Sequence, residues 1–231
     1  MDAVGVRRVL GPPTTVAANL AEDDRLLAEG VPVVRAAPLS DESLSLGVSQ
    51  GDGAACATAA RADGIPVVHR STGGTGVLHL VGDLAWSVVL PRGHPLVGSD
   101  FTRAYGRIGA GVSEALRRRG VGAAWTNALS VHPEYCFLGP RGEALSVDGR
   151  VLGGAAQRLT ARALLHQGVI ARRVDPPRLE RYFKLPTLTS ARYLTGLTEC
   201  GVDDPPERLA ADVVEALARR VEAGGVPRGR A

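Results

Sequence analysis

The sequence of 231 residues has little lysine, little cysteine and few aromatic side chains. Lys184 is the one lysine among the 27 basic residues, so the others are arginines. These arginines are scattered and adjoin one another only in short runs, such as Arg117–Arg119 and Arg172–Arg173, whereas nucleic-acid binding needs a clustered basic stripe. Aromatic residues make up 4% of the chain, but 45% of it is hydrophobic, which is enough to bury a full core. The composition therefore indicates a globular protein with no nucleic-acid partner.

The three cysteines, Cys56, Cys136 and Cys200, are an odd number and lack the spacing of metal ligands. This argues against a disulfide scaffold and against a zinc site. The sequence also lacks the run of roughly 18 apolar residues that a membrane-spanning helix needs, and its first residues have no signal-peptide pattern. We therefore expect a cytoplasmic protein without a metal or a membrane partner, in which any functional cysteine is a free thiol.

Helical and strand patterns follow one another along the chain, with no linker and no internal repeat. The spacing of apolar residues and the capping signals predict helices over 16–29, 56–63 and 101–119, and another that starts at 203–206. Strand patterns cover 31–35, 43–48, 64–68, 77–79, 83–90, 143–147, 151 onward and 162–171. Asp148-Gly149 is typical of a type I′ hairpin turn. We expect one α+β domain over residues 1–231, with a central mixed sheet flanked by helices and a frayed tail from about residue 224.

The segment Arg70–Gly76, RSTGGTG, is too rich in glycine for a helix or a strand, and it lies between two predicted strands. Walker loops and dinucleotide-binding loops must open a helix, so this segment is neither of them. Taken alone, it is a tight turn between strands or a loop that lets a ligand approach the backbone.

Three stretches in this order resemble the catalytic domain shared by biotin-protein and lipoate-protein ligases and the related octanoyltransferases. They are VVHRSTGGTGVLHLVGDLAWS (67–87), CFLGPRGEALSVDGRVLGGAAQ (136–157) and LLHQGVI (164–170). The resemblance implies the fold of that domain. It also implies an acyl group, octanoyl or lipoyl, that is transferred to a lysine of an acceptor protein.

The resemblance further implies which residues form the acyl pocket. Glycines let the backbone approach an acyl chain closely, and backbone N–H groups in such loops can bind negative charge on the acyl carbonyl. The expected substrate-binding residues are Arg70, Thr72, Gly73, Gly74, Gly76, Gly153, Gly154, Gln157 and His166.

Two residues are candidates for catalysis. Cys136-Phe137 resembles the Cys-Phe pair of the octanoyltransferases that use a cysteine nucleophile. A thiolate can take an acyl group from a carrier thioester and pass it to a lysine amine without ATP. His79 follows the glycine-rich segment and is the second candidate. An inert buried thiol and a buried core histidine are the alternatives, and no base for Cys136 is evident.

The sequence departs from the family pattern at two positions. The family has a lysine that grips the activated acyl group directly after the glycine-arginine of the hairpin, and Val151 stands there in this chain. Gln167 stands where many members carry a histidine. Valine supplies neither charge nor a hydrogen bond, so the departure at Val151 disfavours ATP-dependent ligation.

Three functions follow from this resemblance. We favour an acyltransferase that moves an octanoyl or lipoyl group to lipoyl-domain proteins or to an H-type protein of glycine cleavage, with an acyl carrier protein as a donor. The alternatives are a non-catalytic homologue that binds lipoate or another acyl group, and an ATP-dependent lipoate or biotin ligase. Lipoate or octanoate is the expected acyl group, and ATP is not favoured as a co-substrate.

Overall fold

The structure is a computed structural model that describes residues 5–98, 101–127, 130–139 and 143–225. Within these ranges, seven strands form a central sheet: β1 (Arg7–Leu10), β2 (Val33–Pro38), β6 (Leu84–Pro91), β7 (Ala124–Asn127), β8 (Glu143–Val147), β9 (Arg150–Leu159) and β10 (Ala163–Ile170). Their order across the sheet is β1-β2-β6-β10-β9-β8-β7. The β1-β2 pair is parallel and the other pairs are antiparallel, so the sheet is mixed.

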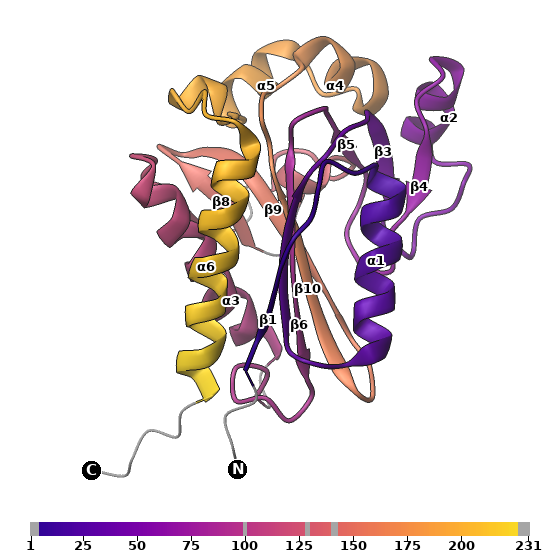
Figure 1. Cartoon of the computed structure of the whole chain (residues 1–231). Coiled ribbons are helices and arrows are strands. Elements are labelled where there is room, and N and C mark those ends of the chain that lie inside the picture. Colours follow the sequence, from indigo (N-terminus) through magenta and orange to yellow (C-terminus); the bar gives the residue numbers. More distant parts are fainter. Residues whose placement is uncertain (1–4, 99–100, 128–129, 140–142, 226–231) are drawn as a thin grey trace.

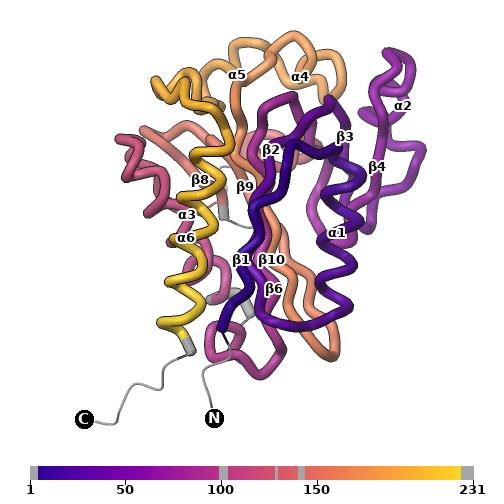
Figure 2. The backbone as a smooth tube through the Cα atoms, viewed as in Figure 1, coloured from indigo at the N-terminus to yellow at the C-terminus, as the bar shows by residue number. Residues whose placement is uncertain are grey.

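Helices cover both faces of this sheet, as Figures 1 and 2 show. One face carries α3 (Phe101–Arg118) and α6 (Pro206–Gly225), and the other carries α1 (Val16–Glu29). Side chains alternate between the two faces along each strand. In β6, Leu84 and Trp86 belong to the core under α3 and α6, whereas Ser87 donates a hydrogen bond to Asp23 of α1.

A smaller sheet of three described strands lies on the α1 side and has the order β4-β3-β5. Its strands are β3 (Ser43–Leu46), β4 (Val67–His69) and β5 (Val77–His79). The nearby helices are α2 (Ala55–Ala62), α4 (Pro176–Phe183) and α5 (Thr187–Tyr193), and two short 3-10 turns cover Cys136–Leu138 and Thr198–Cys200. The glycine-rich segment connects β4 to β5, so the small sheet holds both of its ends.

Local signals explain several of these elements. The side chain of Thr15 caps α1 by accepting from Ala18 N, and Gly30 ends this helix in the left-handed conformation, with φ 69°. Asp148 and Gly149 have φ values of 48° and 77°, as a type I′ turn requires. The α+β fold with a central mixed sheet is therefore confirmed, and the extent of one domain over 1–231 stays a prediction.

Some details differ from the sequence-based expectation. β1, β7, α4 and α5 were not expected. All four residues of β3 are buried: β4 and β5 flank this strand, and its polar side chains are paired internally. α6 continues to Gly225, and Gly224 packs against Leu96, so the first residues of the expected tail are helical. Residues 226–231 of that tail lie outside the described residues.

None of the helices in the described ranges combines the length and the apolar character that are needed to cross a membrane.

Candidate active site

A pocket lies between α1, the glycine-rich segment and the α1-facing side of the central sheet. It encloses about 760 Å³, part of which is open to solvent. Its apolar lining consists of Val16, Leu20, Leu39, Val77, Ala85, Phe137, Ala144 and Val169, and small residues of β9 and β10 form part of its floor. Such a lining suits an alkyl chain.

Strand register divides the floor of the pocket into two layers. In the first layer, Gly154 pairs with Val169, which pairs with Ala85. Two residues further along the strands, Ala156 pairs with Gln167, which pairs with Ser87. Two residues of a strand span about 6.7 Å, so the pocket extends along the strands by at least this length.

A compact hydrophobic cluster closes the pocket beyond the second layer. Leu165 of β10 pairs with Val89 of β6, which pairs with Val33 of β2. These three side chains pack with Leu26 and Leu27 of α1, and all of them are buried. The pocket is therefore blind at this end.

The side chains above the second layer are polar. Asp23 Oδ1 accepts hydrogen bonds from Ser87 Oγ at 2.6 Å and from Arg35 Nη1 at 3.2 Å. Arg35 Nη1 also donates to Asn19 Oδ1 at 2.7 Å. Burial raises the pKa of Asp23 to about 6. Asn19 and Asp23 both line the pocket, so its blind end carries a buried carboxyl group.

Cys136 lies at the first layer, where its neighbour Phe137 contacts Gly154. The backbone N–H of Cys136 donates to Gly76 O at 3.0 Å, which fixes the cysteine beside the glycine-rich segment. Its Sγ lies 3.9 Å from Nη2 of Arg70. The side chain is half-buried and the thiol is free, so the sulfur is accessible from the pocket.

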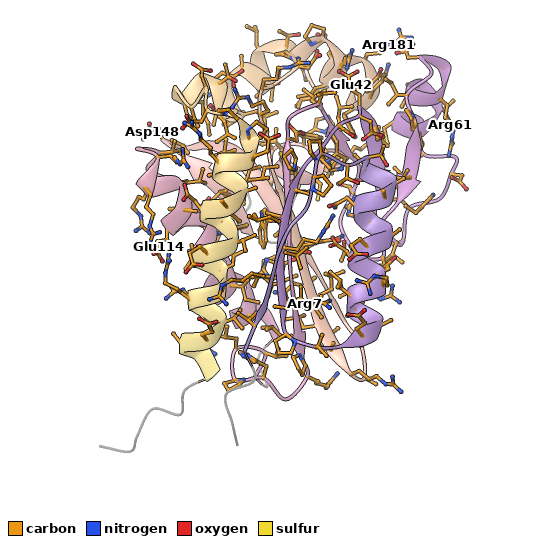
Figure 3. All side chains as sticks on the ribbon, viewed as in Figure 1. Arg7, Glu42, Arg61, Glu114, Asp148 and Arg181 are labelled. Atoms are coloured by element: carbon orange, nitrogen blue, oxygen red, sulfur yellow. The ribbon has the colours of Figure 1, made fainter. Side chains whose placement is uncertain are left out.

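The guanidinium of Arg70 holds the glycine-rich segment in place. Nη2 donates to Gly73 O at 3.0 Å and to Thr75 O at 2.6 Å, and Nε donates to Gly73 O at 3.2 Å. Nη1 donates to the backbone O and to Oγ of Ser45 in β3, both at 3.1 Å. Arg70 is buried, unlike Arg61 and Arg181, which lie at the periphery in Figure 3.

His79 lies on the wall of the same pocket, behind Ser45. Its Nε2 is 2.8 Å from Ser45 Oγ, which in turn accepts from Arg70. Burial and the charge of Arg70 lower the pKa of His79 to about 3. His79 reaches Cys136 only through Ser45 and Arg70 in these contacts, so the neutral ring positions those two side chains.

Thr72 and Gln167 tie the glycine-rich segment to the floor of the pocket. Gln167 Nε2 donates to Thr72 Oγ1 at 2.7 Å, and both side chains are buried. Below the segment, a Cβ on Gly47 would come within 1.9 Å of Gly74 O, so the segment crosses directly over residue 47.

The expected glycines have different surroundings. Gly74 has φ +93°, and a Cβ there would lie 2.8 Å from both Cys136 Sγ and Arg70 Nη2. Gly154 lines the pocket, and Gly73 has open space on its side-chain face. In contrast, Gly76 packs under Phe183, and Gly153 packs against the backbone of β10.

The structure places Gln157 and His166 on the opposite face of the sheet. Gln157 Nε2 is 2.6 Å from His166 Nδ1, and the His166 ring stacks on Trp86 with centroids 5.1 Å apart. Burial lowers the pKa of His166 to about 3. Adjacent residues of a strand face opposite sides, and Gln167 faces the pocket, so His166 faces α3. These two residues therefore pack on the α3 face of the sheet, opposite the pocket.

Val151 lies in a separate small cavity of about 350 Å³, part of which is open to solvent, and this cavity meets the main pocket at Phe137. Its side chain is buried beside Tyr135 and Leu194. The cavity also contains Asp83, which accepts from the backbone N–H groups of Leu80 and Arg172 and whose pKa burial raises to about 7.

Sequence reasoning missed Asn19, Asp23, Ser45 and Gly47 as parts of the site. A signal for the first two was present, because position 23 lies on the inward face of α1 with Val16 and Leu27. A carboxylate at such a core position indicates a buried polar contact.

Within the described residues, no group of three or more His, Cys, Asp or Glu side chains could hold a metal ion.

The comparison with protein families decides the affiliation of this fold and site. Residues 15–205 match the family model of the lipoyl protein ligase A/B catalytic domain. The chain belongs to this family. Its Arg70 segment, Cys136 and hairpin all lie within the matched range.

Curated relatives include octanoyltransferases called LipM. The chain is 32% identical to LipM of Geobacillus kaustophilus over 183 residues, which are 73% of this chain and 66% of the relative. It is 31% identical to LipM of Staphylococcus aureus over 174 residues, which are 68% of this chain and 62% of the relative. The chain therefore spans less than two thirds of the length of these relatives.

Solved structures share the fold at lower sequence identity. A bi-partite lipoate protein ligase from Thermoplasma acidophilum superposes with a TM-score of 0.75 at 20% identity, covering 94% of this chain and 84% of that one. The biotin protein ligase of Aquifex aeolicus, in complex with biotin and ATP, gives a TM-score of 0.54 at 14% identity and covers 95% and 72%.

Gly74→Ala tests the close approach at the mouth of the pocket. The added methyl group would press on Cys136 Sγ and Arg70 Nη2, and the positive φ adds strain. We expect octanoate to bind at least about tenfold more weakly, with the fold retained. Gly73→Ala is the matched control, because its methyl group meets open space. Calorimetric titration with octanoate measures both variants, and equal affinities would contradict this geometry.

Val151→Lys tests whether the second cavity accepts a charged side chain at this position. The ammonium would be buried among Tyr135, Phe137 and Leu194, so we expect a loss of about 2–4 kcal/mol in the free energy of unfolding. Val151→Met changes the size without adding charge and should cost about 1 kcal/mol. Urea denaturation compares the two variants. Equal stability, together with lipoate-dependent release of pyrophosphate from ATP by the lysine variant, would show that this site accepts the ammonium.

Proposed function

We propose that this chain transfers an octanoyl or lipoyl group from a carrier-protein thioester, through Cys136, to a lysine of a lipoyl-domain protein. The observation that carries the proposal is the accessible Cys136 sulfur in a blind, largely apolar pocket beside the buried Arg70. An acyl carbonyl bonded to Sγ would place its alkyl chain along the two floor layers, toward Asp23.

The first step forms an acyl-enzyme. The Cys136 thiolate attacks the thioester carbonyl, so a C–S bond to Cys136 forms and the C–S bond to the carrier breaks. The carrier sulfur leaves as a thiolate and takes up a proton from water. The pocket retains the acyl chain, while the carrier departs.

The second step regenerates the thiolate. The neutral amine of the acceptor lysine attacks the acyl-enzyme, a C–N bond forms, and the C–S bond to Cys136 breaks. The proton of the amine passes to solvent. Because the donor arrives as a thioester, the sequence consumes no ATP.

The relatives support this choice of substrates. The LipM relatives are octanoyltransferases by name, and the archaeal ligase belongs to a lipoylation system with its own E2 lipoyl domain. We extend both relationships to this chain, with lipoyl-domain proteins or an H-type protein of glycine cleavage as acceptors and an acyl carrier protein as donor. A cytoplasmic location stays a prediction.

Use of ATP is less well supported by the residues of the site. An acyl-adenylate needs a cation that grips its phosphate, and Val151 supplies none. The donors of Arg70 are already bonded to Gly73, Thr75 and Ser45. A non-catalytic acyl-binding protein is the remaining alternative, and acylation of Cys136 separates it from the transferase.

We expect intact-mass spectrometry to show an octanoyl adduct when the protein is mixed with an octanoyl-carrier-protein thioester. Hydroxylamine should remove the adduct, and Cys136→Ser should lose at least about 99% of it. Cys200→Ser is the matched control, since Cys200 is also a half-buried free thiol and should acquire no acyl group. An adduct that persists in Cys136→Ser, or no adduct with either octanoyl or lipoyl donors, would contradict the proposal.

A further inference from the structure

We propose that Arg70 supplies the fixed positive charge that stabilises negative charge on the Cys136 sulfur during acyl transfer. This inference rests on the proposed function, because it concerns the same nucleophile. It assigns Arg70 a catalytic role through its charge, in addition to its role in holding the glycine-rich segment.

The first observation is the burial of Arg70 without a carboxylate partner. The residue is 6% exposed, and the hydrogen bonds that the structure shows for it in the described residues go to neutral oxygens and to sulfur. Arg35 is equally buried, at 5% exposure, but it is paired with Asp23. Buried charge is normally compensated by an opposite charge, and a thiolate at residue 136 would provide it.

The second observation is the geometry around the sulfur. Nη2 lies 3.9 Å from Sγ, and the absence of a side chain at Gly74 permits this approach. The two N–H bonds of Nη2 are directed at Gly73 O and Thr75 O. Nη2 therefore offers the sulfur only a long donor contact that it shares with two carbonyl oxygens. Its main effect on the sulfur is Coulomb attraction, which is strong at this distance in a partly buried site.

The third observation concerns the other charges at the pocket. Among the described residues that line it, Arg70 is the one arginine or lysine. His79 is neutral because burial and Arg70 lower its pKa to about 3. The negative charge that develops on sulfur and on the carbonyl oxygen thus forms beside a single cation whose position is fixed by five hydrogen bonds.

Alkylation of the three cysteines by iodoacetamide at pH 7 tests the proposal without an acyl donor. Peptide mass spectrometry measures the rate at each cysteine. Cys136 reports the thiolate, half-buried Cys200 is the internal reference, and buried Cys56 reports unfolding. We expect Arg70→Gln to slow the alkylation of Cys136 at least about tenfold, relative to that of Cys200. Arg70→Lys keeps the charge and should slow it less than about threefold, and Arg35→Gln is the control for loss of an equally buried arginine.

The outcomes separate charge from architecture. Cys136 reacting in Arg70→Gln as fast as in the wild type would overturn the proposal. If Cys56 becomes reactive in Arg70→Gln, that variant has unfolded, and Arg70→Lys decides. A Cys136 alkylation rate that falls less than about threefold supports the role of the charge, and one that falls more than about tenfold in a folded protein overturns the proposal. A wild-type protein whose Cys136 depends on Arg70 in this assay but accepts no acyl group would refute the proposed function and leave this inference standing.

Discussion

The buried guanidinium of Arg70 is the interaction on which the rest of the site depends. It connects Gly73 and Thr75 of the glycine-rich segment to Ser45 of the small sheet. These bonds hold the carbonyl groups of Gly73 and Thr75 in one arrangement, against the large conformational entropy that a glycine-rich backbone loses on folding. The same side chain faces the sulfur of Cys136. One residue therefore both holds the glycine-rich segment over the pocket and places a positive charge beside the sulfur.

The central sheet supplies the second requirement, which is a pocket of limited depth. Antiparallel pairing aligns Gly154, Val169 and Ala85 in one layer and brings the next layer opposite Asp23. Leucine and valine side chains then close the pocket under α1. The depth therefore follows from strand register, and the acyl carbonyl and the chain end fall at different layers of the same sheet.

Sequence reasoning predicted the elements with strong local signals and missed those whose structure depends on tertiary contacts. The cap of Thr15, the Asp148-Gly149 turn and the stripe of α3 are local, and the structure shows them as expected. Which face of the sheet each side chain of β10 points to is not determined locally. A motif that contains His166 and Gln167 does not say which of the two faces the pocket. The pairing of Arg70 with Ser45 joins residues 25 positions apart, which no local pattern indicates.

The most direct test of the account is a chase experiment with isolated acyl-enzyme. The protein is labelled with radioactive octanoyl from a carrier thioester, freed of the donor, and mixed with an apo lipoyl domain in the absence of ATP. We expect the label to move from Cys136 to a lysine amide of the domain at a rate no slower than steady-state turnover. Label that stays on Cys136, while the domain is octanoylated only when donor or ATP is added, would contradict it.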